Sequence, residues 1–234
     1  MIHRILESRE FPYVTANGYY FKRDGLHIVV DTGSALAVHL LKKGLETHGI
    51  SADDIDIVIN THMHIDHCAN NHLFKNARYI VPAEEIGYLK TLFSSSKEEA
   101  ECFFRMLYPS LNERFIKTYV KLLFASKNAV DWMFFHPNVQ RVSGDMFLTN
   151  HIQLITTYGH CPGHICVVVE NDENEFHCIS GDILIDPQDD VNQDGVQHIV
   201  SDKQALMESK KKLKSMVSYV FPGHGNSFNA SVAI

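Results

Sequence analysis

The period of the hydrophobic positions changes several times along the chain, and each change predicts a different element. Continuous or alternating apolar runs are typical of strands, whereas apolar residues every three or four positions are typical of amphipathic helices. The pattern predicts strands over residues 11–23, 26–30, 55–59, 78–81, 146–158, 165–170, 175–180 and 217–221, and helices over residues 36–49, much of 84–135, and 202–216. Strands and helices are mixed without strict alternation, which predicts an α/β class with helices packed on sheets.

The stretch 84–140 is helical in pattern and rich in large apolar side chains, with Pro109 as a break near a helix start. Its large apolar residues are Phe103, Phe104, Met106, Phe115, Phe124, Trp132, Phe134 and Phe135. We interpret it as a helical insertion and keep three roles open. It could form a hydrophobic lid over a cleft, a homodimer interface, or a pair of helices packed on the chain's own sheet.

Composition narrows the class of protein. With 234 residues, 45% hydrophobic and 21% charged, residues 1–234 are expected to form a single globular domain. The formal charge of −7 argues against a nucleic-acid-binding surface. No apolar stretch of membrane-spanning length and no secretory signal are recognised. Five cysteines without a CxxC pair favour a reduced, cytoplasmic setting.

The strongest chemical signal is the run His62-Met63-His64-Ile65-Asp66-His67, directly after a predicted buried strand. In a strand, His62 and His64 would share one face, and a following helical turn would bring Asp66 and His67 back toward them. All four are nitrogen or oxygen donors, which suit zinc and also iron or manganese. The run therefore predicts a metal site.

Two metal ions would need more donors than this run provides, because a catalytic zinc takes about three protein ligands plus water. Three further candidates each end a predicted strand and are flanked by glycine: His160, Asp182 and His224. Glycine lets the backbone turn sharply and approach closely. Ligands at the same ends of several strands would converge on one edge of the sheets.

From Asp31-Thr32-Gly33 to His224, the chain resembles the metallo-β-lactamase superfamily. The resemblance rests on HxHxDH, on Gly-His-Cys-Pro-Gly-His at 159–164, on Ser-Gly-Asp at 180–182 and on Pro-Gly-His-Gly at 222–225, all in family order. It implies an αββα sandwich and two divalent ions, of which zinc is the simplest choice. It further implies that His62, His64 and His160 hold the first ion, that Asp66, His67 and His224 hold the second, and that Asp182 bridges both.

The resemblance also suggests roles for neighbouring positions. Asp66 is expected to act in catalysis by orienting the nucleophile or accepting its proton. Asp31 is either a carboxylate that supports the metal-binding loop or a turn and helix N-cap residue. His164 is expected to be structural, and Cys161 to have a packing role.

Departures from the family's branches limit the reaction. Class B1 β-lactamases have cysteine where this chain has Asp182, and only ten residues follow His224, too few for the C-terminal domain of glyoxalase II. The segment between Asp182 and His224 is also too short for the domain that long RNA-processing nucleases insert between the corresponding positions. We therefore expect hydrolysis of a small ester, lactone or thioester with an apolar part.

Three alternatives stay open. A single-strand nuclease would use the lysine-rich segment 210–214, which we otherwise interpret as a solvated helix face. A non-catalytic metal-binding module would hold metal without turnover. An iron-dependent oxidoreductase is the third, although the complete ligand set fits two metals rather than one.

Overall fold

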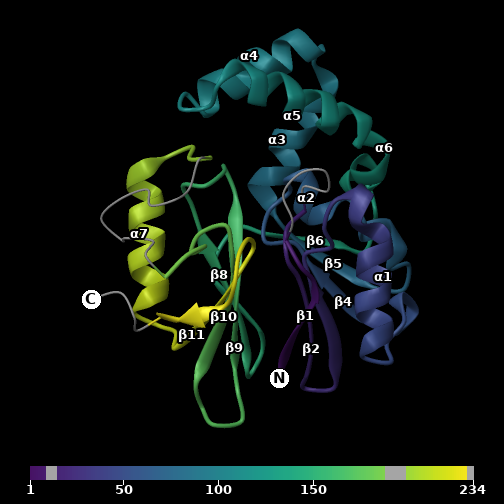
Figure 1. Ribbon diagram of the computed structural model, residues 1–234, viewed down its shortest axis with the longest axis vertical. Helices are drawn as coiled ribbons and strands as arrows, with labels where there is room; N and C mark the ends of the chain where they lie inside the picture. The colour runs from purple at the N-terminus through teal and green to yellow at the C-terminus, as the bar shows by residue number, and fades with distance from the viewer. Residues whose placement is uncertain (9–14, 188–198, 231–234) are drawn as a thin grey trace.

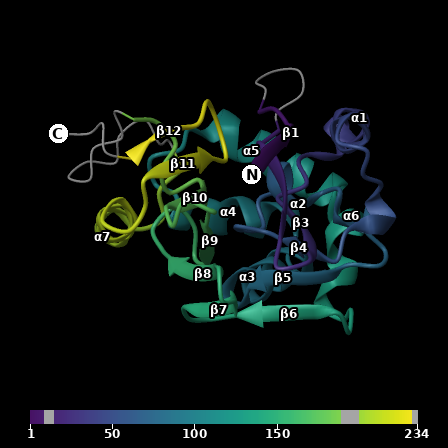
Figure 2. The same ribbon diagram turned by 90° about the horizontal axis from the view of Figure 1, so that it is seen from below.

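The computed structural model describes residues 1–8, 15–187 and 199–230. Within them, the strands form two six-stranded sheets that pack face to face, with helices on the outer faces (Figure 1). Figure 2 shows helix α1 (Val38–Thr47) and helix α7 (Lys203–Lys214) on opposite outer sides of the sandwich. The expected αββα architecture is confirmed.

The two sheets share a similar plan, with a mixture of antiparallel and parallel pairs. The first sheet has the order β1 (Ile2–Leu6), β2 (Gly18–Arg23), β3 (Leu26–Val30), β4 (Ile57–Ile59), β5 (Arg78–Pro82) and β6 (Val139–Val142). The second has the order β12 (Phe228–Asn229), β11 (Tyr219–Pro222), β10 (Phe176–Gly181), β9 (His164–Glu170), β8 (Ile152–Thr157) and β7 (Met146–Thr149). Pairs from β3 to β6 are parallel, as is β10 with β11.

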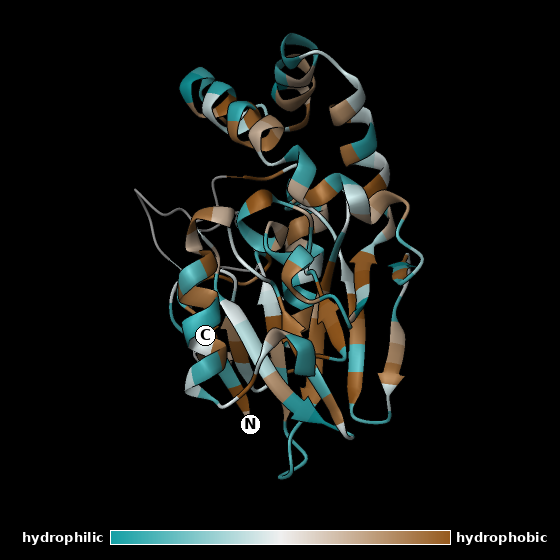
Figure 3. Ribbon diagram, turned by 90° about the vertical axis from the view of Figure 1, so that its right-hand side faces the viewer, coloured by the Kyte–Doolittle hydropathy of each residue, from teal (hydrophilic) through white to brown (hydrophobic). Residues whose placement is uncertain are grey.

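Each strand buries its apolar residues in a core. Ile28 and Val30 of the first sheet pack with Leu154 and Val167 of the second between the two sheets. A second core fills the space between the first sheet and α1 with the inserted helices, and a third lies under α7. Figure 3 shows the hydrophobic residues concentrated in the strands. This packing follows from β-branched residues at alternating or continuous positions.

The helical region lies between β5 and β6 and consists of α3 (Ala83–Ser94), α4 (Lys97–Leu107), α5 (Glu113–Ala125), α6 (Lys127–Val130) and a 3₁₀ turn (Asp131–Phe134). Ser96 and Glu99 form a capping box at the start of α4. Pro109 lies between α4 and α5, so the predicted break is confirmed. Figure 1 shows α4 and α5 at the top of the molecule, above the two sheets.

The large apolar residues of this region divide between core and surface. Phe104 and Phe134 are buried, whereas Met106 and Phe135 are 76% and 84% exposed. Packing on the chain's own sheet therefore buries only some of the large apolar side chains of the helical region. The lid and dimer roles stay predictions.

Several sequence predictions need correction. Strands β1, β6 and β12 were not predicted, because each is short and none has a strong alternation. The strand predicted over 11–23 begins at Gly18, and residues 9–14 lie outside the described part. Lys210 is fully buried rather than solvated, because it lies one turn after Leu206 on the inner face of α7.

Among the described helices, none is both long and apolar enough to cross a membrane. All five cysteines are free thiols, and only Cys102 is exposed.

Candidate metal centre

The seven donor residues expected from the sequence lie together near the carboxyl ends of strands from both sheets. They come from the loop after β4 (His62, His64), helix α2 at Ile65–Cys68 (Asp66, His67), the loop after β8 (His160), the end of β10 (Asp182) and the loop after β11 (His224). Five of them are buried, and the side chains of Asp66 and His224 are 17% and 35% exposed. The site therefore opens to solvent on the Asp66 and His224 side.

Three imidazoles form the first group. The Nδ1 atom of His64 lies 2.9 Å from Nε2 of His62 and 3.2 Å from Nε2 of His160. Two ligand atoms about 2.0–2.1 Å from one tetrahedral zinc ion are about 3.3 Å apart. These two separations are close to that value, and ligand atoms of His62 and His160 lie within 4.8 Å of each other, so the three rings are near enough to share one ion.

Asp66, His67 and His224 form the second group. Oδ2 of Asp66 lies 3.4 Å from Nε2 of His224 and 4.0 Å from Nε2 of His67. The Asp182 carboxylate faces both groups: Oδ1 is 3.5 Å from Nε2 of His67, and Oδ2 is 3.5 Å from Nε2 of His160. Asp182 is thus the residue whose two oxygens reach both groups.

In each histidine of the HxHxDH run, the ring nitrogen that faces away from the donor cluster has a hydrogen-bond partner. Nδ1 of His67 donates to Oδ2 of Asp31 at 2.8 Å, and the Thr61 hydroxyl lies 3.1 Å from Nδ1 of His62. Nε2 of His64 lies 3.4 Å from the Tyr108 hydroxyl. Such partners fix the tautomer and direct the other nitrogen at a shared point.

Asp31 lies behind the ligand run rather than at a helix N-cap. Its two oxygens accept hydrogen bonds from the backbone nitrogen and the hydroxyl of Thr61, at 2.8 and 2.7 Å, in addition to the bond from His67. Its φ of +58° is unusual for a residue other than glycine, and aspartate tolerates it better than most. Of the two interpretations of Asp31, these contacts favour support of the loop.

Burial favours the neutral form of the three imidazoles of the first group. Burial penalises the charged form, so it lowers the pKa of His62 well below its usual value and that of His64 to about 3. Burial also lowers the pKa of His160, although Asp182 opposes the shift. Neutral rings carry the free lone pair that a metal ion requires.

The acidic residues remain ionised despite burial, which by itself would raise their pKa values. The charges of His224 and His67 hold the pKa of Asp182 well below its usual range, and a hydrogen bond from His224 does the same for Asp66. Burial would lower the pKa of His67, but the carboxylates of Asp182 and Asp31 outweigh it and raise that pKa well above its usual value. The ionised carboxylates therefore favour positive charge within the donor cluster.

The fit to divalent metal ions rests on the donor chemistry. Nε2 of His67 and Oδ1 of Asp182 are buried and lie 3.5 Å apart, yet neither makes a hydrogen bond of good geometry. Buried polar atoms are nearly always hydrogen-bonded, so this pair of unsatisfied atoms fits a cation held between them. A Cβ atom at Gly223 would lie 2.2 Å from Oδ1 of Asp182, so only glycine fits beside this carboxylate.

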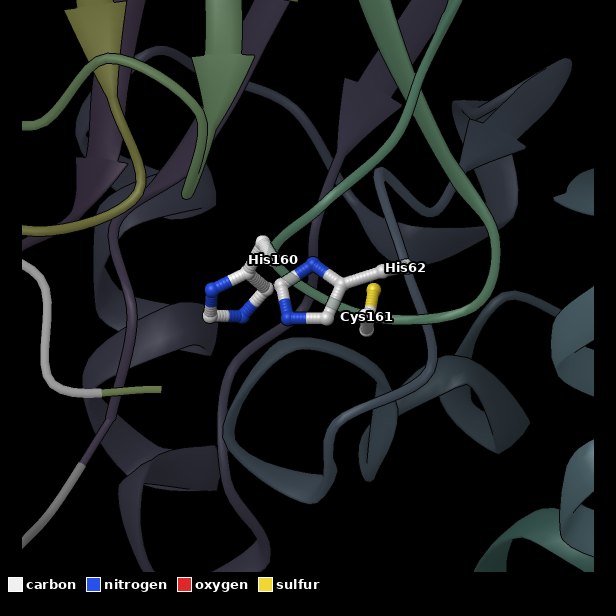
Figure 4. Close-up of side chains that lie close together, drawn as sticks. All are labelled: His62, His160 and Cys161. Carbon is white, nitrogen blue, oxygen red and sulfur yellow. The ribbon is translucent and has the colours of Figure 1, made fainter. Parts of the chain in front are cut away.

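Figure 4 shows Cys161 beside His62 and His160. Its sulfur lies within 4.8 Å of a ring nitrogen of each histidine, so the three residues could also form a metal-binding group. The thiol instead donates to the carbonyl of Gly163 at 3.1 Å. Burial and the charge of Glu85 raise its pKa well above the usual value, which favours the neutral thiol and a packing role.

His164 lies behind the donor cluster. Its Nδ1 is 2.8 Å from the Thr157 hydroxyl, and its Nε2 accepts the backbone N–H of Asp182 at 3.3 Å. This ring holds the strand end that carries Asp182, which agrees with a structural role.

Aromatic residues of the helical region border the cluster. The ring of Tyr119 lies 5.7 Å from that of His64, and Phe115 stacks on Tyr119 at 6.0 Å. Phe115 is 38% exposed, so an apolar surface extends from the donors to solvent.

Sequence reasoning missed two contributors to this site. Thr61 is one residue before the motif and carries no signal of its own, and Tyr108 belongs to the end of α4, about forty residues away. The contact of Tyr108 depends on the packing of the helical region against the ligand loops, and the contacts of Thr61 with Asp31 depend on the pairing of β3 with β4, and no local pattern reveals either.

Comparisons with known proteins agree with this geometry. The sequence profile of the metallo-beta-lactamase superfamily matches residues 13–224. A 61-residue segment, 26% of the chain, is 44% identical to a Methanocaldococcus jannaschii protein named "Probable metallo-hydrolase", of which it covers 30%. An N-acyl homoserine lactonase of Bacillus cereus is 23% identical over 184 residues, which are 77% of this chain and 60% of the relative.

The chain thus spans between 30% and 60% of the lengths of these curated relatives. Among solved structures, the dizinc quorum-quenching lactonase AidC superposes with a TM-score of 0.65 at 20% identity, covering 89% of this chain and 72% of that one. These relatives support the prediction of a metal-dependent hydrolase, and the superposition shows a shared fold. On the profile match across nearly its whole length, the chain belongs to the metallo-beta-lactamase superfamily.

Proposed function

We propose that this protein hydrolyses a small ester, lactone or thioester at a dinuclear metal centre, with zinc as the expected metal. The proposed ligands are His62, His64, Asp66, His67, His160, Asp182 and His224. The observation that carries the proposal is the convergence of these seven donors from five segments of both sheets, with the Asp182 carboxylate reaching both groups.

Two divalent ions, when bound, would supply a nucleophilic hydroxide near neutral pH and would polarise the attacked carbonyl. The chain's own residues hold and orient the reacting groups. Asp66 accepts a hydrogen bond from His224 and faces the open side of the site, where it can take a proton from the nucleophile and return it to the leaving group. Its lowered pKa keeps Asp66 in the ionised form, which accepts hydrogen bonds and can orient the nucleophile.

The aromatic border supports a substrate with an apolar part. Phe115 and Tyr119 form a wall beside His64 that is partly open to solvent. Burial of each methylene contributes about 0.8 kcal/mol, which corresponds to roughly a fourfold change in binding. An acyl chain laid on this wall would therefore raise kcat/KM with each added carbon until the wall is covered.

The test is a panel of acyl-homoserine lactones, aryl esters and thioesters, assayed with chelator-treated and with zinc-loaded protein. We expect turnover only after loading, and a loss of at least about 100-fold in kcat/KM for His64→Ala. His151→Ala is the matched control, because this exposed imidazole pairs with Asp24 away from the donor cluster. Protein that carries two ions and turns over no substrate of the panel would refute the proposal.

A further inference from the structure

Glu85 is a buried carboxyl residue that the proposed chemistry does not use. It lies in the first turn of α3 and is 0% exposed. Its Oε2 accepts the backbone N–H of Met63 at 3.2 Å, and its Oε1 accepts the backbone N–H of Gly163 at 3.1 Å. Glutamate is rarely buried completely unless it is paired, so the location calls for a reason.

The two accepted hydrogen bonds come from the two loops that carry the first group of imidazoles. Met63 lies between His62 and His64, and Gly163 lies three residues after His160. We propose that Glu85 is a positioning residue that holds these two loops in register, so that the three imidazoles converge on one metal ion. The proposal rests on the proposed metal centre and assigns to α3 a part in building it.

The packing around Gly163 supports this role. A Cβ atom there would lie 2.9 Å from Cβ of Glu84 and 3.2 Å from the backbone nitrogen of Glu85. The loop after β8 therefore lies directly against the start of α3, and glycine is required for that approach. The carboxyl group of Glu85 and this close backbone contact hold the same loop at neighbouring points.

A single side chain is an effective link between the loops because each oxygen serves one of them. The Nδ1 of His64 and the Nε2 of His160 are only 3.2 Å apart, so a loop displacement of half an ångström alters their separation appreciably. Burial raises the pKa of Glu85 to about 7 although both backbone N–H groups act to lower it. The chain thus tolerates an unfavourable burial at this position.

Glu85→Gln tests the proposal. The amide has nearly the same size but one acceptor oxygen, so one of the two backbone N–H groups meets an NH₂ donor. We expect zinc affinity at the His62, His64 and His160 position to fall roughly 10- to 100-fold, the usual effect of losing such support. Competition with a chromophoric chelator measures it in a His224→Ala background, which weakens the other position.

Glu84→Gln is the matched control, because it makes the same change one residue earlier on the same helix. We expect its zinc affinity to stay within about twofold of the parent, and the visible spectrum of the cobalt-loaded protein to change only in Glu85→Gln. Equal affinities and equal spectra in the two variants would overturn the role of Glu85 and leave the proposed function standing. A parent protein that binds no zinc at all would overturn both.

Gly163→Ala provides a second route if Glu85→Gln does not fold. It should weaken the same position, because the added Cβ pushes the loop away from α3. Where both variants fold, the double variant should lose less zinc affinity than the sum of the single losses, since both changes disrupt one contact. Additive losses would show two independent effects and would contradict the proposal.

Discussion

Replacing Asp31 by asparagine tests whether the carboxylate behind His67 sets the metal-facing nitrogen. Asp31 is 1% exposed and accepts three hydrogen bonds, two from Thr61 and one from Nδ1 of His67. Asparagine keeps the size and tolerates the positive φ of this position. Its single oxygen cannot serve all three donors, so the NH₂ group turns toward His67.

That change alters the tautomer of the imidazole. An NH₂ donor at Nδ1 favours the ring with its proton on Nε2, which is the atom that faces Asp66 and Asp182. A hydrogen bond to a charged group contributes about 1.5–3 kcal/mol, and loss of such support costs roughly 10- to 100-fold in metal affinity. Asp31→Asn should therefore weaken zinc binding by about 1.4–2.7 kcal/mol.

The assay is zinc titration against a chromophoric chelator, with urea unfolding of the metal-free protein alongside. Asp24→Asn is a matched control, because Asp24 also has a positive φ, of 53°, and also accepts from a histidine, His151, at 2.8 Å. That pair is partly exposed, so its loss should change stability by less than about 1 kcal/mol and zinc affinity not at all. Wild-type zinc affinity in Asp31→Asn would refute the reasoning.

Three further predictions follow from the same contacts. Tyr108→Phe leaves Nε2 of His64 without its partner and should lower zinc affinity up to about tenfold in the same titration. Tyr158→Phe is the control, because this ring is exposed, and it should leave zinc affinity unchanged. Gly223→Ala places a Cβ 2.2 Å from Oδ1 of Asp182, so it should destabilise the fold by about 1–3 kcal/mol in urea unfolding. Gly87→Ala is the control, because nothing lies near its added Cβ, and it should be neutral or stabilising. Burial raises the pKa of Glu85 from 4.5 to about 7, so folding favours its neutral form. The contribution of Glu85 to the free energy of unfolding is therefore fully present below about pH 4.5. It is lost as the pH rises through 7, by about 3 kcal/mol at most. Urea unfolding of metal-free protein between pH 5 and 8 should show this loss in the wild type and not in Glu85→Gln, and equal slopes would contradict it.

The fold was predictable where hydrophobic periodicity was strong. The strand predicted over 26–30 and the helix predicted over 202–216 match the observed β3 and α7 closely. Strand β1 was missed because its apolar residues, such as Ile5 and Leu6, form a very short run that gains stability only by pairing with β2. Strand β6 was missed for the same reason, since its four residues pair with β5 from across the helical region.

The candidate site was predictable where donors are dense in sequence or flanked by glycine. His62 through His67 form a dense run, and His160, Asp182 and His224 each follow a strand beside a glycine. The supporting residues could not be found in this way, since their role depends on contacts between distant segments.

The helical region illustrates why such contacts matter. Sequence alone favours a lid, a dimer face or simple packing, all of which leave the donors independent of these helices. The structure instead joins them at two points: Glu85 of α3 contacts both ligand loops, and the Tyr108 hydroxyl at the end of α4 contacts His64. Because the same helices also carry Phe115 and Tyr119 on the open border of the site, a change made there to alter substrate preference would also move the supports of the donors. Substrate selection and metal affinity are therefore expected to vary together in this chain, and variants in the helical region should be compared only at measured metal occupancy.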